Sequence, residues 1–183
     1  MIELVMAQDE DGLIGIGNKL PWYLKEELAF FKALTENGTV LMGKKTYESI
    51  GKPLKNRTNL IISRRTKQQV FDEVDGSINQ NLLKEIAAIR KEEELGVKRI
   101  SLTRAKEIAK TQNKTFIIGG KQIYKEFLEE ADVLHLSIIK GSYKTNTSED
   151  VFLKLNLINW ELKEELTLES FTYKKYIRMV END

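Results

Sequence analysis

The sequence predicts a single α/β domain with a mostly parallel central sheet, flanking helices and an antiparallel pair of strands near the C-terminus. Three observations lead to this fold class. Short apolar segments alternate with amphipathic helical patterns over most of the chain. The last part changes to two stretches in which polar and apolar residues alternate. The length of 183 residues suits one domain with a substantial core.

The expected elements follow one another along the chain. Buried strands are predicted at Ile2–Ala7, Thr39–Met42, Asn59–Ser63, Lys98–Ser101, Thr115–Ile118 and Val133–Ile139. Helices are predicted between them at Lys25–Thr35, Lys44–Ser49, Leu82–Glu94, Thr103–Lys110 and Ile123–Ala131. This alternation joins parallel strands through right-handed crossovers. The segments Asn159–Leu168 and Phe171–Val180 are predicted to form the antiparallel pair.

Composition excludes several classes of protein. With 29 Lys and Arg against 28 Asp and Glu, the net charge of +1 argues against a nucleic-acid-binding protein. The absence of cysteine excludes disulfides and thiolate metal sites, and a lone histidine, His135, excludes a zinc-binding histidine cluster, so no metal is expected. The N-terminus does not resemble a signal peptide. No apolar run approaches the roughly 20 residues that span a bilayer. We therefore expect a cytoplasmic protein without a membrane partner.

One polar region resembles a linker more than any other part of the chain, and it covers Thr66–Asn81. A charge-rich helix, Leu82–Glu94, follows it, and Gly96 is expected to end that helix. The acidic run Glu92-Glu93-Glu94 is interpreted as a solvated helix end.

Glu27 is the first candidate for chemistry. At about 100° per residue it falls between Leu34 and Phe31, on the apolar side of the helix Lys25–Thr35. Burying a carboxylate there is costly without a partner and would raise its pKa, whereas a cationic ligand would restore its charge. The alternative is a glutamate at the helix edge that reaches solvent or a backbone amide, and the helical pattern leaves both open.

The pair Gly119-Gly120 lies between an apolar strand and a helix. This order allows backbone amides and a helix N-terminus to approach a phosphate. The full G-x-G-x-x-G pattern of dinucleotide-binding turns is missing, and a plain tight turn would also favour glycine.

Two further strand-to-helix junctions carry basic and hydroxyl side chains. They are Gly43-Lys44-Lys45-Thr46 and Ser63-Arg64-Arg65-Thr66. Parallel strands end at one edge of a sheet, where α/β folds bind ligands. Four cations there favour a phosphorylated ligand, although each alone could be solvated surface. Since no acidic residue lies among them to hold a free ribose hydroxyl, a 2′-phosphate is favoured.

The segment Asp11–Trp22 contains three glycines in six residues, directly after the first strand. We expect a long flexible loop of the kind that often forms a lid. No helix begins directly after the glycines, so this is not a dinucleotide-binding turn.

Taken together, these segments resemble the dihydrofolate reductase family. The matching residues, in chain order, are Met6-Ala7; Ile14-Gly15-x-x-Asn18; Leu20-Pro21-Trp22; Leu24-x-x-Glu27-Leu28-x-x-Phe31-Lys32; Val40-x-Met42-Gly43-x-x-Thr46-x-Glu48-Ser49-Ile50-Gly51; Pro53-Leu54-x-x-Arg57-x-Asn59; and Ile117-Ile118-Gly119-Gly120-x-x-Ile123-Tyr124. The ordered set is much more specific than any single motif. It implies a dihydrofolate reductase-like fold and NADPH-dependent reduction of 7,8-dihydrofolate to tetrahydrofolate.

The resemblance also implies roles in catalysis and substrate binding. Glu27 matches the buried acid that binds the pterin 2-amino group and N3, and Trp22 matches the residue that orients a nearby water. Ser137 stands where the family usually has a threonine, and it keeps the hydroxyl. Tyr124 matches a ring beside the pterin and nicotinamide, and completes the catalytic set. The implied substrate-binding residues are Val5, Ala7, Leu28, Phe31, Lys32, Ile50, Leu54, Arg57 and Ile118, with Arg57 taking the substrate's α-carboxylate.

The cofactor implied by the resemblance is NADPH. The positions expected to contact it are Ala7, Ile14, Gly15, Asn18, Gly43, Lys44, Lys45, Thr46, Ser49, Ile62, Ser63, Arg64, Arg65, Gly119, Gly120, Lys121, Gln122 and Ile123. In this family the bond between Gly119 and Gly120 is typically a cis peptide. Protonation of the pterin N5 is expected to be mediated by water, and the Gly15–Leu20 loop is expected to close over the nicotinamide.

Two parts of the chain depart from the family pattern. An Asp-Thr pair near the last hairpin corresponds either to Asn146-Thr147 or to Asp150-Val151. Residues Asp72 to Val97 have no counterpart in compact family members, so we interpret them as a surface insertion in one reductase domain spanning residues 1–183. We expect a monomer.

Two other functions are compatible with this fold. A related reductase acting on a pyrimidine or pterin-like substrate would not need Arg57, since that substrate carries no glutamate tail. A non-catalytic protein that keeps the fold would not need Trp22, Glu27 and Arg57 together.

Overall fold

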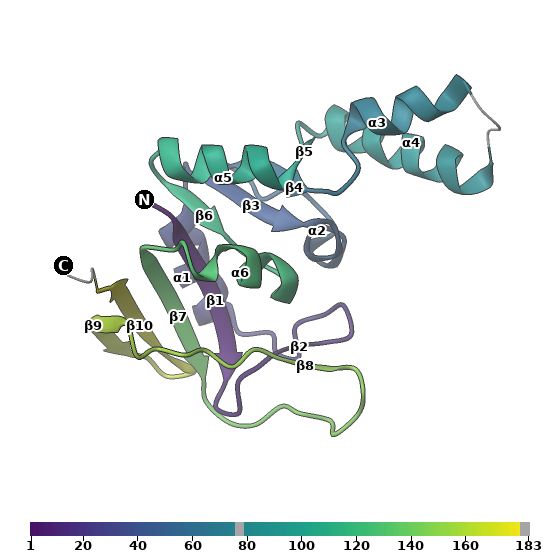
Figure 1. Cartoon of the computed structure of the whole chain (residues 1–183). Coiled ribbons are helices and arrows are strands. Elements are labelled where there is room, and N and C mark those ends of the chain that lie inside the picture. Colours follow the sequence, from purple (N-terminus) through teal and green to yellow (C-terminus); the bar gives the residue numbers. More distant parts are fainter. Residues whose placement is uncertain (76–78, 180–183) are drawn as a thin grey trace.

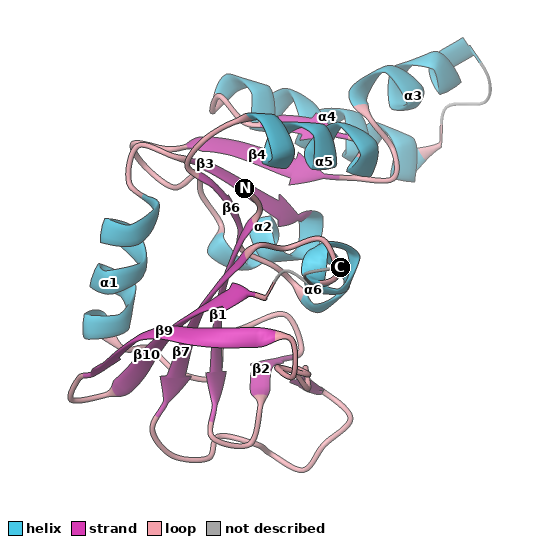
Figure 2. Cartoon of the chain, turned by 60° about the vertical axis from the view of Figure 1, so that its left-hand side comes forward, coloured by secondary structure: helices cyan, strands magenta, loops and turns pink. Residues whose placement is uncertain are grey.

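The computed structural model describes residues 1–75 and 79–179 and has one large sheet with helices on both faces (Figures 1 and 2). The strands of this sheet are β1 (Glu3–Asp9), β3 (Thr39–Gly43), β4 (Thr58–Ile62), β5 (Lys98–Ile100), β6 (Thr115–Ile117), β7 (Val133–Ile139), β9 (Trp160–Thr167) and β10 (Phe171–Arg178). The helices are α1 (Lys25–Thr35), α2 (Lys44–Ile50), α3 (Lys67–Asp72), α4 (Gln80–Glu94), α5 (Leu102–Thr111) and α6 (Lys121–Leu128).

The strand order of the sheet is β5-β4-β3-β6-β1-β7-β10-β9. All neighbours from β5 to β7 are parallel, whereas β10 is antiparallel to both β7 and β9. The predicted fold class is therefore confirmed. The predicted strands and helices of this part agree with the structure to within a few residues at their ends.

The helices divide between the two faces of the sheet (Figure 2). One face carries α5 and α6, whose Ile108 and Phe127 pack in a cluster with Leu4 and Met6 of β1. The other face carries α1 and α2, which pack against alternate residues of the same strands. Because side chains alternate along a strand, β1 contributes to both layers.

The helices α3 and α4 form a hairpin that projects beyond the β5 edge of the sheet (Figure 1). Val70 of α3 is fully buried against Leu82 and Ile89 of α4. The interpretation of Thr66–Asn81 as a linker is wrong for this helix, which starts with a capping box between Thr66 and Gln69. Residues 76–78 of that segment lie outside the described residues. That residues 72–97 are an insertion stays a prediction.

The acidic run at the end of α4 is also corrected by the structure. Glu92 is buried rather than solvated, because its carboxylate pairs with Arg99 of β5. Glu93 remains exposed, as expected for a helix end, and pairs with Lys67.

A small second sheet interrupts the predicted loop Asp11–Trp22. It consists of β2 (Leu13–Ile16) paired antiparallel with β8 (Asp150–Phe152). The segment is thus partly ordered by a strand from far along the chain. No helix in the described residues is long and apolar enough to cross a membrane.

Candidate active site

Three strand ends meet at one edge of the sheet, as the sequence predicts. Gly43 at the end of β3 lies opposite Ile62 at the end of β4. On its other side, the Gly43 amide donates a hydrogen bond of 2.8 Å to the carbonyl of Gly119, which follows β6. The junctions that carry Lys44, Ser63 and Gly120 are therefore neighbours.

The close approach of β3 and β6 leaves little room for a side chain. A Cβ atom on Gly43 would lie 3.1 Å from the Ile123 side chain, and one on Gly120 would lie 3.3 Å from the Thr46 hydroxyl. The bond between Gly119 and Gly120 is cis, as the resemblance implies. Gly43 and Gly120 are the N-caps of α2 and α6, and neither has a side chain that could satisfy the first helical amides. These amides are suited to bind phosphate oxygens.

Tyr124 ties this edge to the centre of the sheet. Its buried hydroxyl donates a hydrogen bond of 2.7 Å to the carbonyl of Val5 in β1. Burial, with a smaller contribution from the charge of Glu27, raises the pKa of Tyr124. The phenol is therefore a neutral, fixed group, and its ring supports the turn at Gly119.

Glu27 is buried, with 7% of its surface exposed, so of the two alternatives that the helical pattern left open the structure has the buried one. Burial raises the pKa of its carboxyl, and the hydroxyl of Ser137 on β7 opposes this shift. Nearby on the same side of the sheet, Trp22 packs in a cluster with Ala7. Its buried indole Nε1–H has no hydrogen-bond partner among the described residues. The site therefore combines a desolvated acid with an unused donor.

The predicted walls of the substrate slot come together. Val5 and Ile118 form one apolar cluster with Phe31, Ile50 and Leu54, which are half-buried. These residues come from β1, α1, α2 and the segments after β6 and α2. Leu28 and Lys32 of α1 are exposed and lie outside this cluster.

Arg57 lies at the C-terminal end of α1. Its Nη1 donates a hydrogen bond of 2.9 Å to the Thr35 hydroxyl, and its Nε donates one of 2.9 Å to the Lys55 carbonyl. Burial lowers the pKa of Arg57, and the charge of Glu36 opposes this shift. Thr35 is a residue that the motifs missed. Its signal was its place on the α1 wheel, at about 20°, between Leu24 and Leu28.

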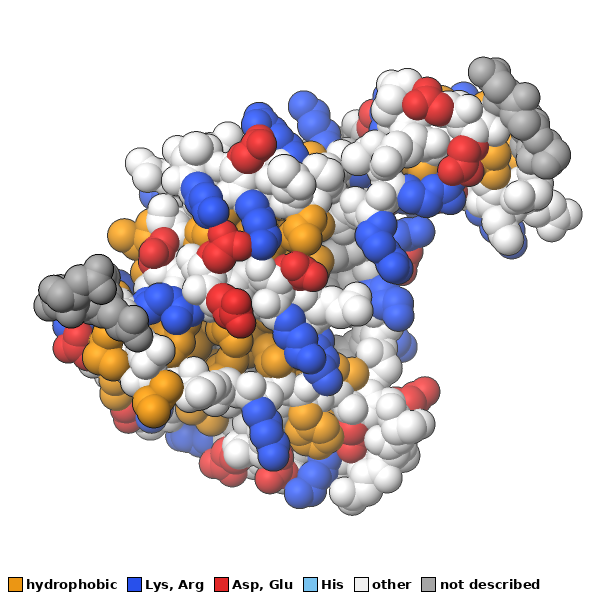
Figure 3. All heavy atoms as spheres, in the orientation of Figure 1, with side chains coloured by type: hydrophobic (Ala, Val, Ile, Leu, Met, Phe, Trp, Pro, Cys, Tyr) orange, Lys and Arg blue, Asp and Glu red, His pale blue; other side chains and the backbone are white. Residues whose placement is uncertain are grey.

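The predicted phosphate-binding cations differ in their surroundings. Lys44, Lys45 and Arg64 are exposed, and Lys44 lies 3.9 Å from Glu48. Arg65 instead forms ion pairs with Glu73 and Glu85. In Figure 3, basic side chains gather on the surface below the α3–α4 hairpin. The other predicted cofactor residues here are Ser49, Lys121 and Gln122, which are exposed, and Ile62 and Ile123, which pack in the core.

The glycine-rich segment is held by the region that contains Asn146 and Asp150. Gly15 is buried in β2, Ile14 is half-buried and Asn18 is exposed. The Gly17 amide donates a hydrogen bond of 2.7 Å to the Glu149 carbonyl. Asp150, opposite Ile16, accepts hydrogen bonds from the amides of Thr145 and Asn146. The structure therefore places Asp150 beside this segment.

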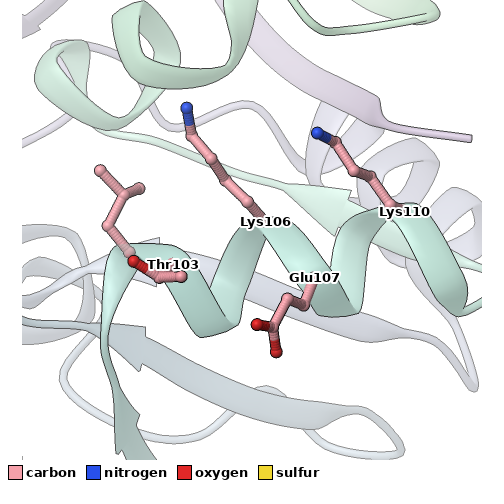
Figure 4. Close-up of a pocket in the computed structure, with 5 residues that line it drawn as sticks. Thr103, Lys106, Glu107 and Lys110 are labelled. Atoms are coloured by element: carbon pink, nitrogen blue, oxygen red, sulfur yellow. The ribbon is translucent and has the colours of Figure 1, made fainter.

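Other features of the surface do not contribute to this site. A pocket of about 360 Å³ is lined by residues of α5, and Figure 4 shows Lys106 and Lys110 on one side of this helix and Glu107 on the other. Both lysines pair with Glu130. Within residues 1–75 and 79–179, no group of three or more His, Cys, Asp or Glu side chains is placed to hold a metal ion.

The substitution Gly119→Ala tests the close packing at the sheet edge. Gly119 has φ +108°, and an added Cβ would lie 3.0 Å from the Tyr124 ring. Gly96→Ala is the matched control, since its φ is +75° and no described atom lies within 4 Å of the added Cβ. The left-handed backbone costs Gly96→Ala about 1–2 kcal/mol, and Gly119→Ala bears at least this cost because its φ lies further from the left-handed helical region. In urea denaturation Gly119→Ala should lose at least about 1 kcal/mol more than Gly96→Ala. Equal losses would show that the Tyr124 ring yields freely.

The substitution Glu27→Gln tests the burial of the acid. Because the pKa of Glu27 is raised in the folded chain, the folded state binds this proton more tightly than the unfolded state. Ionisation of Glu27 therefore lowers stability as pH rises through the folded pKa. The ligand-free variant should be more stable than the unmodified chain at neutral pH, and its advantage should vanish under acid conditions.

Glu26→Gln is the control for this measurement. The pKa of Glu26 is lowered by its hydrogen bonds to Ser170, so the same substitution should reduce stability at neutral pH. Urea denaturation between acid and neutral pH checks both signs. A Glu27→Gln variant that is less stable at neutral pH would contradict the raised pKa.

Comparisons with known proteins agree with the geometry. The family model described as dihydrofolate reductase matches residues 1–180. The dihydrofolate reductase of Mycoplasma genitalium is 36% identical over 96% of this chain and 97% of its own length. That of Ureaplasma parvum is 32% identical over 96% of each chain.

A solved structure is similar over nearly the same length. Dihydrofolate reductase from Enterococcus faecalis, complexed with NADP(H) and RAB-propyl, superposes with a TM-score of 0.72 and is 26% identical. The alignment covers 97% of this chain and 96% of the other. The chain therefore belongs to the dihydrofolate reductase family.

Proposed function

We propose that this chain reduces 7,8-dihydrofolate to 5,6,7,8-tetrahydrofolate with NADPH. The observation that carries the proposal is the buried carboxylate of Glu27, on the same face of the sheet as the apolar cluster that contains Val5, Phe31 and Ile118. Family membership supports the same reaction.

Glu27 is the group that binds the pterin. A buried carboxylate without a cationic neighbour is costly, and the pterin N3 and 2-amino group offer it two adjacent donors. Hydrogen bonds from these donors favour the ionised form and offset the desolvation that raises the pKa of Glu27. The acid thus selects and orients the ring, while Val5, Phe31 and Ile118 enclose its faces.

Arg57 binds the other end of the substrate. Its guanidinium is held at the end of α1 by Thr35, so its remaining donors can take the α-carboxylate of the glutamate tail. Glu27 lies on α1, and Arg57 is held at the C-terminal end of the same helix. The two residues thereby fix both ends of the substrate along α1.

The sheet edge fits the cofactor. Gly43 and Gly119-Gly120 leave room for a pyrophosphate against the N-termini of α2 and α6, where any larger residue would add a Cβ. Lys44, Lys45 and Arg64 supply positive charge beside it. When bound, NADPH supplies the hydride that C6 of the pterin receives.

The residues around Glu27 supply the proton pathway. The unpaired Nε1–H of Trp22 can donate to a water molecule between the indole and the pterin. Such a water carries a proton to N5, which Glu27 itself does not contact, and the apolar walls exclude other water. Ser137 supports the carboxylate in this arrangement, and Tyr124 stays neutral at the floor.

We also propose that the protein acts as a cytoplasmic monomer on small molecules, without nucleic acid. The nearly balanced charge of 29 basic and 28 acidic residues supports the part of this proposal that excludes a nucleic-acid partner. Size-exclusion chromatography with light scattering should give the mass of one 21.1 kDa chain. A stable dimer would contradict the proposed oligomeric state.

The reaction is tested by following loss of the reduced-nicotinamide absorbance after dihydrofolate is added to enzyme and NADPH. Glu27→Gln should lower kcat by about 100-fold or more, since it removes the charged partner of the pterin. NADPH affinity in a fluorescence titration should change less than about twofold, because the sheet edge is untouched.

Glu26→Gln is the matched control on the same helix, since Glu26 hydrogen-bonds Ser170 instead of facing the slot. It should retain turnover. Absence of dihydrofolate-dependent oxidation in the unmodified chain would refute the proposed function. An equal loss of NADPH affinity in Glu27→Gln would refute the role of Glu27.

A further inference from the structure

An ion-pair network connects the α3–α4 hairpin to the turn after β4. We call it the α4 network, and its members are Arg65, Glu73, Glu85, Glu92 and Arg99. Glu85 of α4 joins two arginines: one carboxylate oxygen lies 2.7 Å from Arg65 Nη1, and the other lies 3.2 Å from Arg99 Nη1. Arg65 Nη2 also lies 2.6 Å from Glu73.

The inner half of the α4 network is a buried anchor. The Arg99 side chain is 1% exposed, and its Nε and Nη2 donate to the two oxygens of Glu92 at 2.7 and 2.9 Å. A two-point pair of this kind fixes the orientation of both groups. Since Arg99 belongs to β5, the anchor fixes α4 to the outermost strand of the sheet.

The outer half of the α4 network reaches the proposed cofactor site. The Ser63 amide donates to the Ile100 carbonyl at 3.0 Å, and the Arg65 amide donates to the Ser63 hydroxyl at 3.3 Å. The Arg65 side chain then extends to Glu85 of α4 and to Glu73, which directly follows α3. The turn is therefore held at both ends, and the exposed Arg64 lies between these holding points.

We propose that Arg65 is a positioning residue for cofactor binding and not a phosphate ligand. Through Glu85 and Arg65, the α4 network holds the turn so that Ser63 and Arg64 receive the 2′-phosphate that distinguishes NADPH from NADH. This inference rests on the proposed function, and it assigns cofactor preference partly to α4.

The charges favour this assignment over direct contact. The α4 network contains three carboxylates and two guanidinium groups, so it offers no surplus positive charge to a phosphate dianion. Both Glu73 and Glu85 lie against the Arg65 guanidinium and would repel a phosphate placed beside it. Arg64 has no ion-pair partner among the residues described in the structure.

The two roles for Arg65 predict opposite effects of Glu85→Gln on the affinity for NADPH. Three variants are compared, namely Glu85→Gln, Arg65→Gln and the double variant. Fluorescence titration gives Kd for NADPH and NADH, and steady-state kinetics gives KM for the same cofactors. If Arg65 positions the turn, both single variants should weaken NADPH binding by about fivefold, because the turn must then be ordered on binding. The double variant should be no weaker than either one, and NADH binding should stay unchanged.

Direct contact would produce a different pattern. Glu85→Gln would release Arg65 and tighten NADPH binding, whereas Arg65→Gln would weaken it, and this result would overturn the inference. Equal weakening of NADPH binding and NADH binding would show a merely structural role and would also overturn the inference. An unchanged preference for NADPH over NADH in both single variants would overturn it as well.

Two further variants keep the test decisive. Glu73→Gln loosens Arg65 from an exposed position, at 58% side-chain exposure, so it carries the same prediction if Glu85→Gln does not fold. Glu93→Gln is the matched control, since the Lys67–Glu93 pair joins α3 to α4 without touching the turn. It should leave the preference unchanged.

The unmodified chain separates the two levels of failure. If it does not oxidise NADPH with dihydrofolate, the proposed function fails. If it does so and the variants keep the preference for NADPH, only the inference fails.

Discussion

The close approach of the backbone at Gly43 and Gly119 is the constraint on which the site depends. Their hydrogen bond of 2.8 Å joins the ends of β3 and β6, where side chains would have to displace Ile123 or Tyr124. Because the backbones meet, α2 and α6 begin beside each other, and their free amides converge. The same approach places the Tyr124 hydroxyl on the Val5 carbonyl, which links the cofactor edge to the floor of the slot.

The burial of Glu27 is a cost that the surrounding core has to offset. Its helix packs through Phe30 and Phe31 into two clusters on the same face, so α1 stays in place although it carries a desolvated acid inward. The site is thus less stable than an apolar one would be, and it is prepared for a ligand that returns hydrogen bonds to the carboxylate. A ligand can return these hydrogen bonds only if the carboxylate is held in a fixed position, and α1 holds it there.

Much of the fold and the site followed from local patterns, and the failures have a common cause. Helical periodicity placed Glu27 on the apolar side of its helix but left burial and exposure both open, and the family resemblance favoured burial. Glycines after strands were enough to locate the edge where the strand ends meet. The pairing of β2 with β8 was missed because each strand is short and its partner lies more than 130 residues away. The prediction that Glu92 is solvated was wrong, because Arg99 of β5 pairs with its carboxylate. Partners distant in sequence leave no periodic signal.

Arg64 and Arg65 show how the same limit affects function. In the sequence they are adjacent, equal in charge and placed after the same strand, so a count of cations treats them alike. In the structure one is exposed, and the other is held by two carboxylates that follow it by 8 and 20 residues. An arginine already paired in this way has fewer donors left for a ligand, but it holds its backbone more firmly. Local charge near a binding edge therefore has to be assigned after its partners are known, because a pairing carboxylate changes a cation from a ligand into a support.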